Sequence, residues 1–356
     1  MSVATMTRSQ LRIQRRAQVL DAEVRQDPGA FRILTGDRPT GALHVGHYFG
    51  SLQNRVRMQD AGVDMLVVIA DYQAMTDRIV PPDLADVVIG LVADYLAVGI
   101  DPRRSIIFAH SQVASLNQLV LPFLSLVSVA EIGRNPTVKE ETAAAGLARV
   151  TGLMFTYPVH QAADILCCHA NLVPVGLDQL PHLEITRAIA RRFNELYSPG
   201  APYFAEPDAL LSAAPLLPGT DGQKMSKSRN NSVPLRASAD ETARLLIRAK
   251  TDSERHISYE PGRRPEVAGL LSLTALCRDS TPQEVADEIG AAGAAALKAA
   301  AVEAVNERFA PVRARRRELA ADPGYLRAVL AEGNGRANAI ADETLCAVRE
   351  LMHQRY

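Results

Sequence analysis

The chain has 356 residues, of which 47% are hydrophobic and 22% charged, with a formal net charge of -1. This length and apolar content can bury one large or two smaller cores, and the near-neutral charge means that RNA could be met only by local basic patches. Asp, Arg or Pro interrupts every hydrophobic segment, which excludes a membrane span, and four cysteines without a CxxC pair predict free thiols in the cytoplasm.

Residues 1–30 are predicted to form an N-terminal extension. The first twenty residues contain four arginines and no acidic residue, a composition typical of an organelle transit peptide. Asp21 and Glu23 follow at once, and this favours a short helical or disordered extension instead.

Short apolar runs then alternate with longer amphipathic stretches. The runs at 32–36, 65–71, 105–111 and 171–176 are predicted to be buried strands, with helices between them. This alternation is typical of an α/β domain with a mostly parallel sheet, which we place at 31–235. Ligands of such sheets gather at the carboxyl ends of the strands, so the residues after each run matter most.

Two intervening helices are the clearest. The first helix is predicted within residues 83–101; it follows a Pro-Pro pair and ends at Gly99. The second, residues 177–196, follows the fourth strand directly. Residues 217–236 have no periodicity and are rich in Gly, Ser, Asn and Lys, which predicts an exposed loop.

Residues 236–356 are predicted to form a helical domain. Ser238 with Glu241 and Thr281 with Glu284 are capping-box helix starts, and the remainder is rich in Ala, Leu and Arg. We expect the last helix to pack back on the first domain.

The stretch TGDRPTGALHVGHYFGSL, residues 35–52, places His44 and His47 among four glycines after the first strand. A strand, a glycine-rich turn and a helix start offer backbone N–H groups and a helix N-terminus to an anion, which favours a phosphate site. A metal is the alternative, but the only other Cys/His cluster, residues 167–169, has adjacent side chains that diverge. We therefore predict no metal ligand, and a purely structural role for both histidines stays open.

The second motif is KMSKS, residues 224–228, in the predicted loop. Lys224 and Lys227 on a flexible segment make a mobile cationic clamp for a polyphosphate leaving group. Taken alone, this motif is more simply interpreted as a solvated Lys/Ser loop. The presence of the histidine stretch in the same chain argues against that simpler interpretation.

Together HVGH and KMSKS resemble the signature pair of the class I aminoacyl-tRNA synthetases. YLAVGIDP, AADIL, VPVGLDQLPHLEITR, TDSE and EGNGRANAIADETL are similar, in order and spacing, to the tryptophanyl members of that family. The resemblance covers about residue 32 to the C-terminus.

The resemblance implies a Rossmann-type catalytic domain, a helical anticodon-binding domain and a homodimer that joins L-tryptophan to tRNA(Trp). It also implies ATP as substrate, with Mg²⁺ held chiefly by the ATP phosphates. His44, His47, Lys224 and Lys227 would be catalytic. The ATP-binding positions would also include Arg38, Pro39, Thr40, Gly46, Lys139, Gly176, Leu177, Asp178, Met225, Ser226 and Ser228.

The choice of amino acid is assigned to the predicted helix YPVHQAADIL. A buried carboxylate that accepts the indole N–H penalises side chains without that donor, because the acid would be left unpaired in an apolar pocket. Asp164 matches the family position for this role, and Tyr157 and Gln179 match positions that meet the ammonium and carboxylate of the substrate. An Asp164 that faces solvent or a neighbouring Arg is the alternative.

The chain departs from the commoner family pattern at one polar contact to the ATP ribose and around the indole pocket. Leu177 stands where a Glu is common, Gln73 where many members have His, and Gln161 where many have Met. With these changes the chain resembles a variant branch of the family. Members of that branch are sometimes a second copy of the enzyme in the cell and tolerate tryptophan-like inhibitors.

Three rival functions stay open. The tyrosyl enzymes share the architecture, although Asp164 argues against them, and a small-molecule adenylyltransferase could use the same histidine motif. A non-catalytic relative could act as a regulator. For tRNA, the arginine cluster at residues 313–317 is a candidate phosphate contact, and a solvated helix face explains it equally well.

Overall fold

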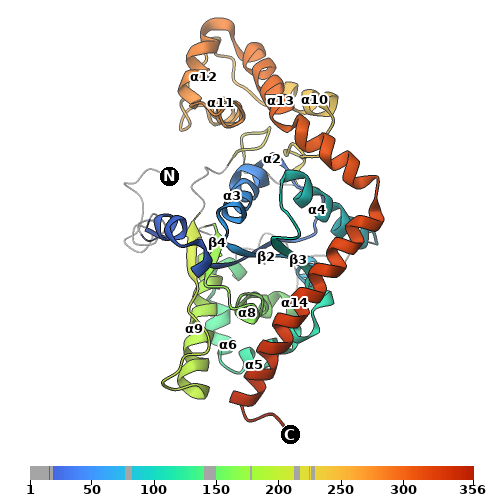
Figure 1. Ribbon diagram of the computed structural model, residues 1–356. Helices are drawn as coiled ribbons and strands as arrows, with labels where there is room; N and C mark the ends of the chain where they lie inside the picture. The colour runs from blue at the N-terminus through green and yellow to red at the C-terminus, as the bar shows by residue number, and fades with distance from the viewer. Residues whose placement is uncertain are drawn as a thin grey trace.

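The computed structural model describes residues 16, 19–76, 82–139, 150–176, 179–211, 217–223, 225 and 229–356. In this part of the chain a parallel sheet forms the centre (Figure 1), with strands β1 (Arg32–Asp37), β2 (Asp64–Ile69), β3 (Ser105–Ala109), β4 (Leu172–Val175) and β5 (Asp208–Leu211). The strand order is β3-β2-β1-β4-β5, and all neighbours are parallel. The predicted α/β fold is confirmed. The sequence missed β5, because DALL is too short and too polar at its start to stand out.

Helices connect the strands and cover the sheet. Those within the α/β part are α2 (Val45–His47), α3 (Gln53–Ala61), α4 (Leu84–Val98), α5 (Ala114–Leu124), α6 (Val129–Arg134), α8 (Gly152–Cys167) and α9 (Leu180–Tyr197). Shorter helical turns are η2 (Pro28–Ala30), η3 (Tyr48–Leu52), η4 (Tyr72–Met75) and η5 (His110–Gln112). The helices predicted at 83–101 and 177–196 are present, and α4 ends at Gly99, whose φ of 115° only glycine adopts easily.

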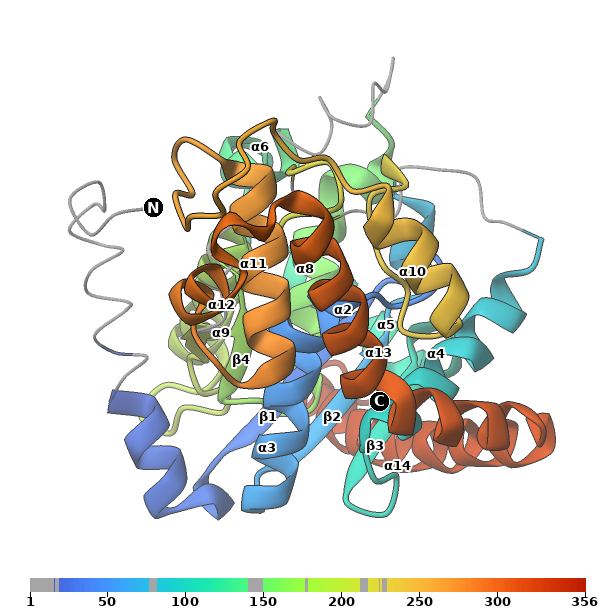
Figure 2. The ribbon, with the colours of Figure 1, turned by 90° about the horizontal axis from the view of Figure 1, so that it is seen from above.

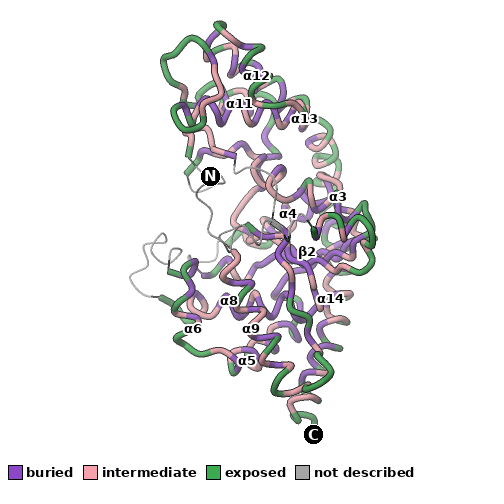
Figure 3. The backbone as a smooth tube through the Cα atoms, turned by 90° about the vertical axis from the view of Figure 1, so that its left-hand side faces the viewer, coloured by how far each residue is buried: buried purple, intermediate pink, exposed green. Residues whose placement is uncertain are grey.

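The sheet is buried on both faces, as a parallel sheet requires. Successive β2 side chains point to opposite faces. Met65 and Val67 therefore join one hydrophobic core with α4, while Leu66 and Val68 join the other with α5, α8 and α9. Figure 3 shows the buried backbone concentrated in these layers.

The chain after β5 contains α10 (Ala239–Ile247), α11 (Pro265–Arg278), α12 (Pro282–Ile289), η8 (Gly290–Ala292), α13 (Ala294–Ala320) and α14 (Pro323–Leu351). Both predicted capping boxes form, at Ser238 with Glu241 and at Thr281 with Glu284. Helices α10 to α13 lie beyond the end of the sheet where α2 begins (Figures 1 and 2).

Helix α14 returns along the open edge of the sheet. It packs on β3 and α5, and the backbone N–H of Ala109 in β3 donates to Oδ1 of Asn334 at 3.0 Å. The helix therefore satisfies a ladder group that an edge strand would otherwise leave exposed.

The predicted ends of two strands need correction, whereas the short helical extension favoured for the N-terminus agrees with the structure. The run 65–71 ends as a strand at Ile69 and the run 105–111 ends at Ala109, since Asp71 caps η4 and His110 begins η5. Part of the N-terminal extension, residues 19–26, is helical, and its Leu20 and Val24 are buried in the core.

Two further features concern the described chain as a whole. None of its helices combines the length and the apolar composition that crossing a membrane requires. The four cysteines are free thiols.

Candidate active site

Polar side chains gather where the carboxyl ends of the parallel strands meet. Asp71 follows β2 and His110 follows β3. The Asp71 Oδ1 atom accepts hydrogen bonds from the backbone N–H groups of Tyr72 and Ser111, both at 3.0 Å, which joins the two turns. Ligands of open α/β sheets bind at this edge, so the candidate site lies here.

The two histidines of the predicted phosphate-binding stretch lie at the start of a helical run, residues 45–61, that follows β1. Their ring centroids are 3.7 Å apart, and the backbone N–H of His44 donates to Nδ1 of His47 at 3.1 Å. A neutral His47 ring therefore carries its proton on Nε2. A proton donor at the positive end of a helix suits an anionic ligand.

A buried ion pair at the end of β1 lies close to the histidine stretch. Asp37, at the end of β1, contacts Nη1 of Arg55 at 2.7 Å and the hydroxyl of Tyr95 at 2.8 Å. Burial by itself would raise the pKa of Asp37. The charges of Arg55 and His47 and the two hydrogen bonds outweigh burial and hold this pKa at about 2.

The segment after the KMSKS motif pairs with the histidine stretch. The Val45 N–H donates to the Val233 carbonyl at 3.0 Å, and the Leu235 N–H donates to the Leu43 carbonyl at 2.9 Å. Met225 is buried, and a Cβ added at Gly46 would lie 3.2 Å from its Sδ atom. The fold therefore brings two motifs some 180 residues apart into contact.

The remaining predicted nucleotide-side residues are placed as follows. Arg38 donates to the Thr76 hydroxyl at 3.5 Å, and the Thr40 N–H donates to the Arg38 carbonyl at 2.8 Å in a tight turn. Gly176 is exposed at the end of β4, and Lys139 is exposed beyond α6. Pro39 is buried in the same turn as Arg38 and Thr40. The predicted positions outside the described residues are Leu177, Asp178, Lys224, Ser226, Lys227 and Ser228.

Asp164 is buried in α8, with 2% of its surface exposed. The alternative in which Asp164 faces solvent is therefore wrong. Its Oδ1 atom lies 2.8 Å from Nε2 of His110, which is fully buried. The ring of His160 lies 4.5 Å from that of His110. Burial, and secondarily the charge of His110, lowers the pKa of His160, although Asp164 and Asp71 oppose this shift.

These three buried residues could in principle hold a metal, since one ligand atom from each lies within 4.8 Å of the others. Two ligands of a tetrahedral zinc ion, at about 2.0–2.1 Å from it, would be roughly 3.3 Å apart. The 2.8 Å between His110 and Asp164 is shorter than that. The distance favours a direct contact between the ring and the carboxylate over a shared ion.

Tyr157 is also buried in α8, and its hydroxyl lies 2.9 Å from Nε2 of His182 in α9. Gln161 in α8, Gln73 in η4 and Gln179 before α9 are half-buried. The backbone N–H of Gln179 donates to the Gly176 carbonyl at 3.0 Å.

The histidines around Asp164 and Tyr157 were not predicted from the sequence. His110 ends a strand run and His160 lies one helical turn before Asp164, so both carried a weak signal. His182 is fully buried on α9, and nothing in its own segment indicates its partner in α8.

The predicted basic cluster on α13 is only partly a surface. Arg313 is buried, where it donates to the Leu235 carbonyl and the Thr242 hydroxyl, and burial lowers its pKa. Arg316 is paired with Asp94. These two arginines join α13 to the rest of the protein, so they are not exposed phosphate contacts.

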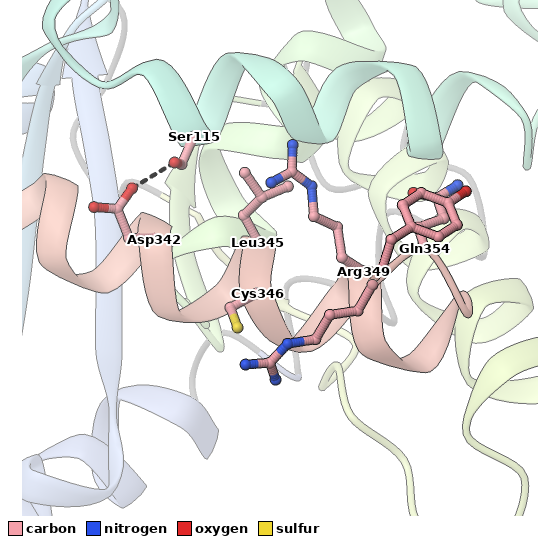
Figure 4. A pocket seen from close by; sticks show the side chains of 8 residues that line it. Ser115, Asp342, Leu345, Cys346, Arg349 and Gln354 are labelled. Carbon is pink, nitrogen blue, oxygen red and sulfur yellow. Dashed lines mark hydrogen bonds between the residues drawn. The ribbon is translucent and has the colours of Figure 1, made fainter.

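A shallow hollow of about 750 Å³ lies elsewhere, between α5 and the end of α14 (Figure 4). Ser115 and Asp342 are hydrogen-bonded at one end of it, and Arg349 and Gln354 line the other. None of the predicted site residues lines this hollow. We therefore do not assign it to the candidate active site at the ends of the strands.

The chain as a whole is similar to known proteins. Residues 26–310 match the family model of the class I tRNA synthetases for W and Y. The tryptophan–tRNA ligase of Streptococcus pneumoniae serotype 4 is 41% identical over 338 residues, covering 91% of this chain and 98% of that protein.

Solved structures agree with the sequence matches. The tryptophanyl-tRNA synthetase of Campylobacter jejuni, complexed with ADP and tryptophan, matches with a TM-score of 0.79 and 30% identity, over 90% of this chain and 99% of that one. The tyrosyl-tRNA synthetase of Archaeoglobus fulgidus, complexed with L-tyrosine, shares the fold with a TM-score of 0.62 and 20% identity, over 80% and 90% of the two chains.

Proposed function

The chain belongs to the class I tRNA synthetases, in the family for tryptophan and tyrosine, and from this premise we propose that it charges tRNA(Trp) with L-tryptophan. The tryptophan carboxylate attacks the α-phosphate of ATP, a C–O–P link forms, and pyrophosphate leaves. A terminal ribose hydroxyl of the tRNA then attacks the activated carbonyl carbon, and AMP leaves. Such transfers ask a protein mainly for positioning and charge stabilisation.

The observation that carries this proposal is the contact between the two signature motifs. Residues 43–45 pair with residues 233–235, and Met225 packs against Gly46. Nucleotide phosphates at the His44 and His47 helix start would therefore lie near the KMSKS segment. We assign Lys224 and Lys227 to the departing pyrophosphate, whose charge grows as the bond breaks.

We assign the nucleotide side of the site to the residues around these motifs. They are Arg38, Pro39, Thr40, Gly46, Lys139, Gly176, Leu177, Asp178, Met225, Ser226 and Ser228. The Mg²⁺ of the family would neutralise phosphate charge. Among the described residues, no group of three His, Cys, Asp or Glu ligands lies at His44 and His47, which fits an ion held mainly by ATP.

We assign the amino-acid side to α8 and its neighbours. Asp164 would accept the indole N–H, because its buried carboxylate would lose a partner with any side chain that lacks this donor. Tyr157 and Gln179 would meet the ammonium and carboxylate groups, and Gln73 and Gln161 would lie around the ring.

ATP–pyrophosphate exchange with each of the twenty amino acids tests the proposal. We expect exchange with tryptophan and with no other amino acid at comparable rate. Exchange with tyrosine alone would reassign the chain to the tyrosyl enzymes, and a lack of exchange with every amino acid would favour a regulator.

One observation favours a second role within this function, as a variant that tolerates tryptophan-like inhibitors. His110 and His160 are polar neighbours of Asp164, and Gln73 in η4 and Gln161 in α8 are half-buried. Repeating the exchange with an indole-ring analogue as inhibitor measures this tolerance, against a relative that has Met at the position of Gln161.

We also propose a homodimer. Leu121 in α5 and Val129 in α6 are large apolar side chains with 75% and 74% of their surfaces exposed. Exposed apolar side chains on successive helices are typical of a surface that a second copy covers.

A further inference from the structure

One face of α13 reaches the histidine stretch and the segment that pairs with it. Helix α13 packs on α10, α11 and α4 (Figure 1). Its Phe309, Arg313 and Arg316 follow one another at spacings of four and three residues, so their side chains lie on the same face of the helix. Phe309 and Arg313 are buried, and the Arg316 side chain is 17% exposed.

Phe309 packs against the two residues that follow His47. Its ring centroid lies 5.0 Å from that of Tyr48 and 5.9 Å from that of Phe49, and both pairs meet edge to face. The rings of Tyr48 and Phe49 also meet edge to face, at 5.1 Å. Because aromatic pairs prefer this geometry, the three rings fix one another, and the turn after His47 is packed against α13.

Arg316 acts on the other side of the two histidines, through Asp94 of α4. Its Nε atom donates to Oδ1 of Asp94, which is buried with 3% of its surface exposed. The second carboxylate oxygen, Oδ2, accepts the backbone N–H of Leu43 at 3.4 Å. Leu43 precedes His44 directly, so this ion pair holds the entry to the histidine helix start.

Arg313 holds the segment that pairs with Leu43. Its Nε atom donates to the Leu235 carbonyl at 3.4 Å, Nη2 to the Thr242 hydroxyl at 2.8 Å and Nη1 to Oδ1 of Asn306 at 2.6 Å. A planar guanidinium with three fixed partners is rigidly placed. The Leu235 N–H donates in turn to the Leu43 carbonyl at 2.9 Å. The same face of α13 therefore holds both members of this backbone pair.

We propose that Phe309, Arg313 and Arg316, together with Asp94, are positioning residues for ATP, because they hold the backbone on both sides of the two histidines. The proposal rests on the proposed function, in which the histidine stretch meets the ATP phosphates. The four side chains act through that stretch and do not touch ATP. Transfer at a phosphate depends on accurate placement of the reacting groups, so a small shift of the stretch is costly.

The tryptophan side of the site should be insensitive to this face. The hydrogen bonds, ion pairs and ring contacts of the four side chains lead to α4, α10, α13 and the two paired segments, and none leads to α8. A defect confined to ATP therefore distinguishes positioning of the histidine stretch from a general loss of structure.

Arg313→Met and Asp94→Asn in the full-length chain test the proposal. The first keeps the apolar stem and loses the three hydrogen bonds, and the second removes the charge that pairs with Arg316. In ATP–pyrophosphate exchange we expect each variant to raise the KM for ATP about tenfold, with the KM for tryptophan within about twofold of wild type.

Both variants leave a buried polar or charged group without its partner, so part of the protein can fail to fold. Titration of active sites by the burst of aminoacyl-adenylate counts the folded sites, and a merely structural role would lower that count without changing the KM for ATP. Arg313→Lys is a second variant. Its ammonium can still donate to the Leu235 carbonyl, so the KM for ATP should stay within about threefold of wild type.

Arg308→Met is the matched control on the same helix, because Arg308 pairs with Asp279 at 3.3 Å and has no contact with the histidine stretch. Its KM for ATP should stay within about twofold of wild type. Combining Asp94→Asn with Arg316→Met tests the link between these two residues. If both act on the Leu43 N–H, the double variant should be no worse than the more impaired single variant.

An unchanged KM for ATP in Arg313→Met and Asp94→Asn, an equal rise for both substrates, or the same rise in Arg308→Met would overturn the proposal. Effects of Asp94→Asn and Arg316→Met that multiply would overturn the link through Asp94. If the wild type exchanges pyrophosphate with tryptophan and the variants fail these expectations, only the positioning role is refuted. A wild type without this exchange refutes the proposed function itself.

Discussion

At the scale of single residues, Asp164 combines burial with an ionisable group. Its carboxylate has 2% of its surface exposed and contacts His110 at 2.8 Å. A buried carboxylate needs partners, because an unpaired charge in an apolar site is costly. Oδ1 of Asp164 accepts no hydrogen bond within the part of the chain that the structure describes, although Nε2 of His110 lies 2.8 Å away. We assign the missing partner of this carboxylate to the indole N–H of the substrate.

Asp164→Asn should raise the KM for tryptophan by about tenfold to a hundredfold, because a neutral amide is a weaker acceptor than a carboxylate. Pyrophosphate exchange at varied tryptophan measures this effect. Asp101→Asn is the control, since Asp101 pairs with Arg103 away from the site. An Asp164→Asn enzyme with wild-type tryptophan affinity would remove the specificity argument.

The ion pair of Asp37 and Arg55 makes a different prediction, which concerns stability. The folded pKa of Asp37 is about 2, below its ordinary value of 3.8. A lowered pKa contributes stability above the unfolded value, and this stability is lost as the pH falls through the folded value. We therefore expect the pair to lose about 2 kcal/mol of stabilisation between pH 4 and pH 2.

Urea unfolding from pH 7 down to pH 2 measures this loss for the wild type and for Asp37→Asn. At pH 7 the variant should be less stable by about 3–5 kcal/mol, because it leaves a buried Arg55 without its charge partner. The difference between the two proteins should shrink below pH 4. Asp60→Asn breaks an exposed pair with Arg104 and should change stability by less than about 1 kcal/mol at any pH.

At the scale of elements, the packing of α14 against β3 depends on one glycine. Gly333 lies so close to β3 that an added Cβ would be 1.8 Å from the carbonyl oxygen of Ile107. The neighbouring Asn334 accepts the N–H of Ala109 in the same strand. The close approach therefore allows the helix to cover the edge of the sheet.

Gly333→Ala should destabilise the protein by about 3 kcal/mol or more, because the helix must move away from the strand to relieve the clash. Gly335→Ala in the same helix is the matched control. An added Cβ there meets nothing within 4 Å, so alanine should stabilise the helix by about 0.5–1 kcal/mol. Thermal or urea unfolding compares the two, and equal effects would contradict the role given to Gly333.

At the scale of the whole molecule, the exposed apolar residues of α5 and α6 predict association of two copies. A Leu121→Lys, Val129→Lys double variant should dissociate the dimer, since it would place charges in an apolar interface. Light scattering after size-exclusion chromatography measures the mass. Ile247→Lys, at an apolar residue of α10 that is 59% exposed, should leave the mass unchanged. A monomeric wild type would refute the proposal.

The sequence by itself determined the parallel α/β fold, four of the five strands that the structure describes and the residue types of the signature motifs. It could do so because helix and strand periodicity, capping boxes and glycine turns are local properties of the chain. The family resemblance added Asp164 and Tyr157 as candidate positions in α8, and both are buried in the structure.

Only the tertiary structure decided which side chains meet. His110 reaches Asp164 across 54 positions and Asn135 reaches His182 across 47, because strand ends and packed helices bring distant residues together. It also showed that Arg313 and Arg316 are used inside the fold. Contacts of this kind depend on how elements pack and on which hydrogen bonds burial forces them to satisfy, and neither is written in the local pattern of residues.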